Sequence, residues 1–327
     1  MDYLRKIFRV ILIAFIALYY VIAANADITV SSKDTSQVSW VTKAVSASGV
    51  HFRTFKSKAA GTMVSYHVYS PPIYNRNKTL RLPVLYWLHG TGGGVAGIAR
   101  LSALFDRAIQ DGKIPPMLVV FPNGLATSMW SNSKDGKVPM ETVVVKELVP
   151  LIDSSYRTIA KREGRLIEGF SMGGYGAARL GLKYPEVFGS VSILAGGPFD
   201  INFQGPRARN NPIQRENILR HTFGGDMEYF RAQNPYTLAK QYAAMRRGRL
   251  IIRMVVGDRD FTAPDNRSFS ELLDRLQIEH SYNEVPGVGH NPITLFEAFG
   301  ESNWMFYRKI FGKVASSAST TSSLFNR

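Results

Sequence analysis

A serine flanked by glycines is the residue of this chain best placed to act as a nucleophile. Ser171 is the centre of Gly169-Phe170-Ser171-Met172-Gly173, between a short apolar run at 166–168 and a segment of small residues at 174–182. A nucleophile at a sharp turn from strand to helix needs a strained backbone, and glycines two residues away on either side let the neighbouring elements approach. The pattern predicts that Ser171 projects into a pocket. A glycine-rich turn that only packs a helix on a sheet is the alternative interpretation.

A serine hydroxyl is a weak nucleophile, so a histidine base and an orienting carboxylate must accompany Ser171. For a nucleophile at such a turn, the acid and then the histidine follow the serine along the chain, at the ends of the last strands. Three of the six histidines precede Ser171, while His221 lies in an irregular stretch and His280 begins a strand. His290 is therefore the predicted base. Asp258 and Asp260 both follow the apolar run at 250–256, and these residues alone leave the choice of acid open.

Acyl transfer also needs backbone N–H donors aimed at the oxygen that becomes negative. The first is expected from Met172, at the start of the predicted helix, where the helix dipole favours negative charge. The second is expected from the loop 89–94, which follows the apolar run 84–88. Thr91 and Gly92 are both candidates, and the sequence does not decide between them. These donors would complete an oxyanion hole around the reacting acyl group.

The same loop contains a glycine pattern that could be mistaken for a cofactor site. Residues 92–97 match G-x-G-x-x-G, but a dinucleotide site needs an acidic residue at the end of the next strand. That strand ends in Phe121-Pro122-Asn123, which contains no acidic residue, so the pattern does not indicate a dinucleotide site. No zinc-ligand spacing and no phosphate-binding GK[ST] loop occurs in the sequence, and Asp258 and Asp260 do not by themselves make a calcium site. No cofactor and no metal are therefore expected.

Apolar runs alternate with segments of helical periodicity along most of the chain. Strands are predicted at 64–69, 84–88, 117–121, 166–168, 191–195, 250–256 and 281–285, and helices at 101–110, 142–152, 174–182, 266–276 and 292–311. Most of the runs are continuous rather than alternating, as in strands that are buried on both faces of a parallel sheet. The predicted fold class is α/β, a three-layer sandwich with a mostly parallel central sheet.

The ends of the chain and one long connection depart from this alternation. A basic start, an apolar run and Ala24-Asn25-Ala26 predict a signal peptide at 1–26, and hence a secreted or periplasmic protein without a stable membrane span after cleavage. One domain is expected over 27–313, with a partly helical cap insertion at 197–247. The Ser-, Thr- and Ala-rich segment 314–327 predicts a disordered tail.

Charge and cysteine content narrow the range of partners. Residues 1–26 hold three of the 40 basic and one of the 25 acidic side chains, so the remainder carries a net charge of +13. Such an excess favours solubility and association with anionic surfaces. No basic run is interleaved with aromatic residues, so nucleic acid is not an expected partner. Because the chain has no cysteine, the hydrophobic core must stabilise it without disulfides.

Several motifs together resemble the putative esterase family, which includes S-formylglutathione hydrolases of the esterase D type, feruloyl and acetyl xylan esterases, and mycolyltransferases of the antigen 85 type. The resemblance covers roughly residues 50–312. The motifs are Val64-Ser65-Tyr66 with Ser70-Pro71-Pro72, Leu85-Tyr86-Trp87-Leu88-His89-Gly90, Glu147-Leu148-Val149-Pro150-Leu151-Ile152-Asp153, residues 169–174, and Gly257-Asp258-Arg259-Asp260-Phe261 followed by Asn266-Arg267. It implies an α/β-hydrolase fold, with Asp260 as the acid of a Gly-x-x-Asp turn and His290 as the histidine of a Gly-His pair. The stretch 197–247 and the basic charge depart from the family.

The main hypothesis is an exported serine carboxylesterase that hydrolyses a small-molecule or polysaccharide-linked ester through an acyl-enzyme on Ser171. One alternative keeps the three catalytic residues and transfers the acyl group to a sugar or glycolipid hydroxyl. The other is a non-catalytic exported binding module. The sequence does not identify the acyl chain or the alcohol part of the substrate, or the oligomeric state of the protein.

Overall fold

The structure is a computed structural model that describes residues 38–197, 199–200, 202, 212–245 and 249–324. The predicted signal peptide at 1–26 and parts of the predicted cap lie outside these residues. Among the described residues, no helix has both the length and the apolar character that crossing a membrane requires.

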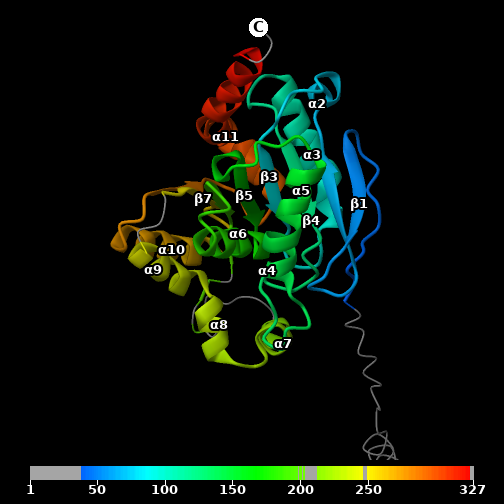
Figure 1. The fold of residues 1–327 in the computed structure, drawn as a ribbon. Coiled ribbons are helices and arrows are strands. Elements are labelled where there is room, and N and C mark those ends of the chain that lie inside the picture. The colour runs from blue at the N-terminus through cyan, green and yellow to red at the C-terminus, as the bar shows by residue number, and fades with distance from the viewer. Residues whose placement is uncertain (1–37, 198, 201, 203–211, 246–248, 325–327) are drawn as a thin grey trace, which may run out of the picture. The chain divides into compact units, whose positions relative to one another are not determined.

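Eight strands form one sheet in the order β1-β2-β4-β3-β5-β6-β7-β8 (Figure 1). The strands are β1 (Val50–Lys56), β2 (Met63–Tyr69), β3 (Val84–Leu88), β4 (Leu118–Pro122), β5 (Arg165–Phe170), β6 (Ser190–Leu194), β7 (Ile251–Gly257) and β8 (His280–Val285). From β4 to β8 every neighbouring pair is parallel, whereas β2 runs antiparallel to both β1 and β4. This confirms the predicted α/β class with a mostly parallel sheet.

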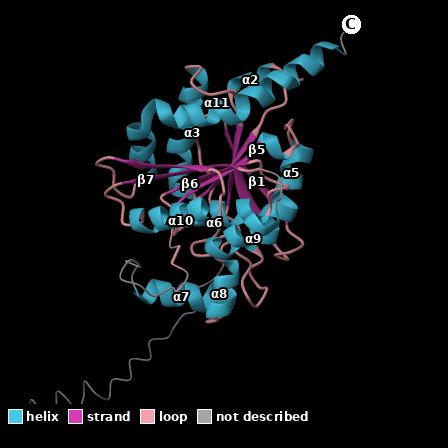
Figure 2. Cartoon of the chain, turned by 90° about the vertical axis from the view of Figure 1, so that its left-hand side faces the viewer, coloured by secondary structure: helices cyan, strands magenta, loops and turns pink. Residues whose placement is uncertain are grey.

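Helices cover both faces of the sheet (Figure 2). They are α2 (Pro72–Arg76), α3 (Val95–Gln110), α4 (Met140–Thr142), α5 (Val149–Ser155), α6 (Met172–Lys183), α7 (Pro212–Phe223), α8 (Met227–Gln233), α9 (Pro235–Met245), α10 (Ala263–Arg275) and α11 (Pro292–Leu324). Successive strand residues serve opposite faces, as β3 shows. Tyr86 packs in the core under α6 and α10, whereas Leu85 and Trp87 pack in the core under α3 and α11. The result is the three-layer sandwich that the alternation of elements predicts.

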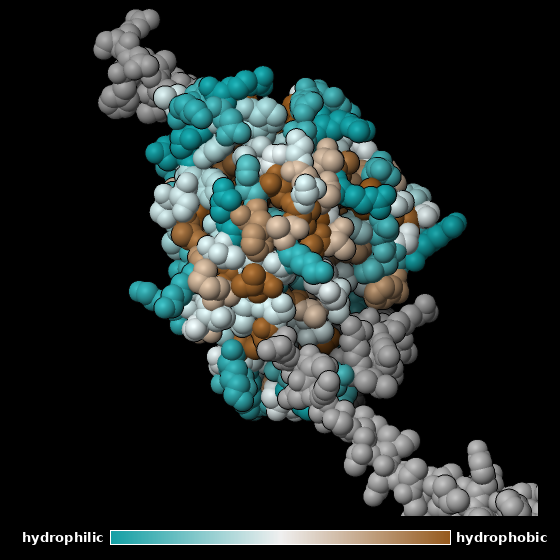
Figure 3. Space-filling view, turned by 90° about the vertical axis from the view of Figure 1, so that its right-hand side faces the viewer, coloured by the Kyte–Doolittle hydropathy of each residue, from teal (hydrophilic) through white to brown (hydrophobic). Residues whose placement is uncertain are grey.

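The first strand was not among the predicted ones because its composition is that of an edge strand. In β1 the side chains of His51, Arg53 and Lys56 are exposed, and Phe52 and Phe55 are only partly buried. An edge strand has one free side, and charged residues there discourage pairing with other chains. On this side of the molecule, apolar side chains lie among polar ones (Figure 3).

The segment predicted as one helix at 142–152 contains a change of helix type. A π-helical turn at Val143–Leu148 separates α4 from α5. Pro150 lies at the start of α5 and has no N–H to donate to the preceding turn. The backbone widens there instead, as is common where an α-helical ladder is interrupted.

Three helices, α7, α8 and α9, occupy residues 212–245, within the stretch where a partly helical cap was expected. The side chain of Asp226 caps α8 by accepting hydrogen bonds from the N–H groups of Glu228 and Tyr229. At the other end of the chain, α11 continues past the predicted helix into the segment 314–324 and contains a kink at Gly300, where φ is 56°.

Candidate active site

Ser171 lies at the turn between β5 and α6 with φ 59° and ψ −122°. Residues other than glycine rarely adopt a positive φ, so this backbone is strained and the surrounding structure must hold it. The Ser171 N–H donates to the carbonyl of Leu194, and the Ser171 carbonyl accepts from the N–H groups of Tyr175 and Gly197. The end of β6 and the first turn of α6 therefore fix the conformation of the serine.

The glycines on either side of Ser171 are required by close backbone contacts. A Cβ at Gly173 would lie 1.9 Å from the carbonyl oxygen of Leu88, and one at Gly169 would lie 2.3 Å from the carbonyl oxygen of Gly173. Neither contact can be relieved by moving a side chain, because both partners are backbone atoms. The turn between strand and helix can therefore form only with glycine at these two positions.

Asp260 and His290 form a hydrogen-bonded pair at the ends of the last two strands. Nδ1 of His290 lies 2.8 Å from Oδ2 and 3.0 Å from Oδ1 of Asp260, whose side chain is buried. Thr262 donates its N–H and its hydroxyl to Oδ1, each at 2.8 Å. An ionised carboxylate only accepts hydrogen bonds, so Nδ1 of His290 carries the proton and Nε2 keeps its lone pair. This is the tautomer that a general base needs.

Asp258, the other candidate acid, is exposed and holds the loop that carries His290. Its Oδ1 accepts the N–H of Gly287 at 2.7 Å, and its own N–H donates to the carbonyl of Val285. The structure therefore joins Asp260 to the histidine and uses Asp258 in a turn.

His290 lies beside the serine turn, between two aromatic rings. Its ring centroid is 4.5 Å from that of Phe170, the residue before Ser171, and 4.4 Å from that of Phe261. Ser171, Asp260 and His290 follow β5, β7 and β8, whose parallel carboxyl ends share one edge of the sheet. Within the described part of the chain, no hydrogen bond joins the Ser171 hydroxyl to His290. Such bonds are often long in enzymes without substrate and tighten on binding.

The predicted oxyanion donors belong to two segments near Ser171: Met172 follows it in the chain, and the loop that carries Thr91 and Gly92 contacts it through Gly90. Met172 begins α6, so its N–H is one of the amides at the helix N-terminus. A Cβ at Gly90 would lie 3.3 Å from Cβ of Ser171, which places the loop after β3 against the serine. The N–H of Gly92 donates to the carbonyl of Ala126 at 2.9 Å. That bond occupies the Gly92 amide, which favours Thr91 as the second donor.

A buried ion-pair network anchors α6, the helix that begins at Met172. Arg179, fully buried, donates to Glu141, to Gln233 and to the carbonyl of Trp130. Glu141 also accepts from Tyr184 and pairs with Lys183. Burial raises the pKa of Glu141, but Arg179 and Lys183 outweigh it and hold the pKa at about 2. The network ties α6 to α4 and α8.

Replacement of this carboxylate is expected to reduce the pH dependence of stability. The pKa of Glu141 lies below its value of 4.5 in an unfolded chain, so the stabilisation is complete above pH 4.5 and declines as the pH falls towards 2. Glu141→Gln should therefore lower the free energy of unfolding at pH 7 by on the order of 3–5 kcal/mol, and by less at pH 3.5. Urea unfolding of both proteins at the two pH values measures this. An equal difference at both pH values would contradict it.

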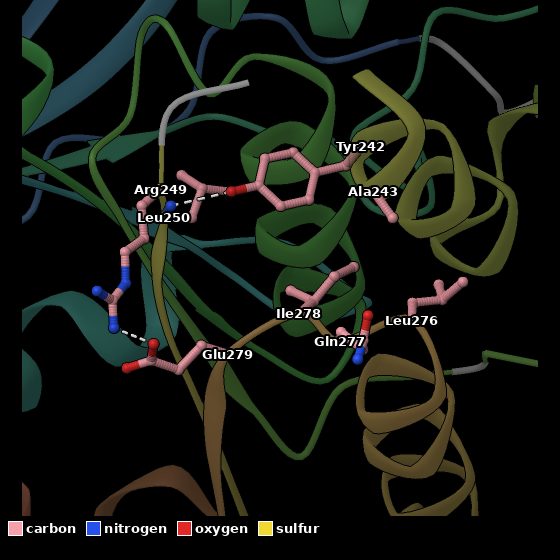
Figure 4. Close-up of a pocket in the computed structure, with 8 residues that line it drawn as sticks. All are labelled: Tyr242, Ala243, Arg249, Leu250, Leu276, Gln277, Ile278 and Glu279. Carbon is pink, nitrogen blue, oxygen red and sulfur yellow. Dashed lines mark hydrogen bonds and ion pairs between the residues drawn. The ribbon is translucent and has the colours of Figure 1, made fainter. Parts of the chain in front are cut away.

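A cavity of about 360 Å³ lies at the amino ends of β7 and β8, opposite to the carboxyl ends where Asp260 and His290 lie (Figure 4). It is lined by Tyr242, Ala243, Arg249, Leu250, Leu276, Gln277, Ile278 and Glu279. Leu250 precedes β7 and Glu279 precedes β8, whereas Asp260 and His290 follow these strands. The cavity is therefore separate from the candidate site. Among the described residues, no group of three or more His, Cys, Asp or Glu side chains could hold a metal ion.

A strained serine between strand and helix, an Asp–His pair at the same sheet edge and a mostly parallel sheet define an α/β-hydrolase. The model of the putative esterase family matches residues 57–309. The chain therefore belongs to this family.

Curated relatives and solved structures agree with this assignment. Esterase Rv1288 of Mycobacterium tuberculosis is 35% identical over 266 residues, which cover 72% of this chain and 54% of that protein. An endo-1,4-beta-xylanase/feruloyl esterase of Xylanibacter ruminicola is 37% identical over 156 residues, which cover 45% of this chain and 21% of that protein. The chain thus spans about half or less of the length of these relatives.

Solved structures show the same fold at lower identity. An S-formylglutathione hydrolase from Agrobacterium tumefaciens has a TM-score of 0.64 at 19% identity, covering 83% of this chain and 99% of that one. A ferulic acid esterase has a TM-score of 0.62 at 22% identity, and the match covers 80% of this chain and 95% of that one.

Proposed function

We propose that this chain is an exported serine carboxylesterase, with Ser171 as nucleophile, His290 as general base and Asp260 as the acid that orients it. The hydrogen-bonded Asp260–His290 pair beside the strained Ser171 is the observation that carries the proposal. The substrate is a small-molecule or polysaccharide-linked ester, which the feruloyl esterase name of one relative supports. Export is proposed from the signal-like segment 1–26, and the excess of basic residues favours association with anionic surfaces.

The reaction proceeds in two acyl transfers. Oγ of Ser171 attacks the carbonyl carbon while its proton passes to Nε2 of His290, and Asp260 stabilises the resulting imidazolium. The N–H groups of Met172 and Thr91 bind the negative oxygen of the tetrahedral intermediate. The alcohol then leaves with the proton from His290. Water, deprotonated by His290, attacks the acyl-enzyme and releases the acid and the free serine.

The test is to locate an acyl-enzyme analogue by mass spectrometry. The purified protein should hydrolyse p-nitrophenyl acetate, and a fluorophosphonate should abolish that activity with one adduct, on the peptide that contains Ser171. Heat-denatured protein serves as the control, because a serine without its base does not react. Absence of both activity and labelling would favour the non-catalytic binding module, and an adduct on another serine would contradict the assignment.

The acyltransferase alternative differs only in the molecule that accepts the acyl group. Product analysis with an added sugar or glycerol acceptor separates the two functions. We expect free acid as the main product; a new ester that forms in preference to acid would replace the hydrolase proposal by the transferase.

A further inference from the structure

His89, the first residue after β3, is buried and makes a hydrogen bond with each ring nitrogen. Its Nε2 lies 2.9 Å from the backbone nitrogen of Gly124. A backbone N–H can only donate, so Nε2 is the acceptor. Burial lowers the pKa of His89 to about 4, so the ring is neutral at pH 7 and carries its one proton on Nδ1. Nδ1 therefore donates to the carbonyl of Gly90, 2.7 Å away.

This hydrogen bond sets the direction of the next amide along the chain. In a trans peptide the C=O and N–H groups point in opposite directions. The carbonyl of Gly90 faces the His89 ring, so the N–H of Thr91 in the same peptide points away from that ring. Gly90 packs against Ser171, with a Cβ at Gly90 reaching within 3.8 Å of the serine Oγ. The Gly90–Thr91 peptide therefore lies close enough to Ser171 for the direction of the Thr91 N–H to affect the reacting oxygen.

We propose that His89 is a positioning residue of the oxyanion hole: its Nδ1 proton turns the Gly90–Thr91 peptide so that the Thr91 N–H faces the oxygen that becomes negative. The inference rests on the proposed esterase function, and it adds a residue that neither touches the substrate nor takes part in proton transfer.

Packing around His89 keeps the ring in this orientation. Trp130 donates its indole N–H to the His89 carbonyl at 3.2 Å, and the two rings meet edge to face with centroids 5.0 Å apart. On the loop itself, a Cβ at Gly94 would lie 2.3 Å from Cδ2 of His89. Met129 and Trp130 both have positive φ, at 52° and 54°. A strained segment that is held in place by its surroundings is typical of functional sites.

Two substitutions separate the two hydrogen bonds of His89. In His89→Asn the amide can occupy the place of Nδ1 and still donate to Gly90, whereas the bond from Gly124 is lost. In His89→Gln the amide oxygen can occupy the place of Nε2 and accept from Gly124, whereas the bond to Gly90 is lost. We expect His89→Gln to lower kcat for p-nitrophenyl acetate about 100-fold with little change in KM, as for loss of one oxyanion donor. His89→Asn should lose about tenfold or less.

A trifluoromethyl ketone, which forms a tetrahedral adduct with the serine, gives a second measurement. Its affinity should fall with kcat in His89→Gln, because both depend on the oxyanion hole. His280→Gln is the matched control. The side chain of His280 is also buried and also makes a hydrogen bond with each ring nitrogen, but it lies at the start of β8, at the other end of the strand from His290. The control should keep wild-type kcat.

Equal losses of kcat in the Asn and Gln variants, or a loss in His89→Gln that appears only in KM or Tm, would overturn the inference. If neither variant folds, ¹⁵N NMR of the wild-type imidazole at pH 7 decides: a proton on Nδ1 supports the inference, and a proton on Nε2 overturns it. A wild-type protein without activity or fluorophosphonate labelling would instead end the proposed function.

Discussion

Ser171→Ala should lower kcat for p-nitrophenyl acetate by about 10⁶-fold, the loss expected when the nucleophile of a serine hydrolase is removed. The remaining rate over water would come from the oxyanion donors and from substrate binding, which the substitution leaves in place. Alanine also fits the site, because it is smaller than serine and the backbone bonds to Leu194, Tyr175 and Gly197 do not involve the side chain. The Tm should therefore change little.

The control for this variant is Ser102→Ala. Ser102 is a buried serine of α3 whose hydroxyl donates only to the carbonyl of Ala99, one turn earlier in the helix. Its replacement should leave kcat unchanged. Full activity of Ser171→Ala would refute the assignment of the nucleophile.

Asp260→Asn should lower kcat by about 10⁴-fold, because it reverses the tautomer of His290. The two donors of Thr262 hold an acceptor at the Oδ1 position. In the variant the amide oxygen must take that position, so the NH₂ group takes the Oδ2 position, 2.8 Å from Nδ1 of His290. Nδ1 then accepts, the ring proton moves to Nε2, and the serine loses its base.

Asp258→Asn provides the matched comparison, since it makes the same chemical change two residues earlier. An amide oxygen can still accept the N–H of Gly287, so kcat should stay within about threefold of the wild type. Steady-state kinetics on both variants, with Tm measured alongside, tests the assignment. A large loss in Asp258→Asn with a small one in Asp260→Asn would exchange the roles of the two carboxylates.

Local patterns in the sequence predicted most of the central sheet and the position of Ser171 at a turn from strand to helix. Buried parallel strands are continuous apolar runs, and the turn at Ser171 needs glycines at 169 and 173 because of backbone contacts that the structure locates. The edge strand β1 was not predicted, because polar and apolar residues mix along it. The π-helical turn before α5 depends on how Pro150 interrupts a ladder of hydrogen bonds, which hydrophobic periodicity does not reveal.

The finer choices at the site depended on contacts between distant segments. Asp258 and Asp260 follow the same strand, so composition and spacing left the choice open. The Gly-x-x-Asp turn of the family resemblance pointed to Asp260, and the contacts of Asp258 with Gly287 and of Asp260 with His290 agree with it. Thr91 and Gly92 differ because Ala126, far along the chain, accepts the N–H of Gly92. His89 was set aside as a base because it precedes Ser171. Its place beside a glycine-rich loop, directly after a buried strand, was the available signal for a different role.

A crystal structure of the protein inactivated by a phosphonate ester tests the central claim most directly, because the phosphorus mimics the tetrahedral carbon of the intermediate. We expect a covalent bond from Oγ of Ser171 to phosphorus and the phosphoryl oxygen about 3 Å from the N–H groups of Met172 and Thr91. Nε2 of His290 should lie within hydrogen-bond distance of Oγ or of the leaving-group oxygen. An adduct in which the His290 ring stays out of reach of both oxygens would contradict the account.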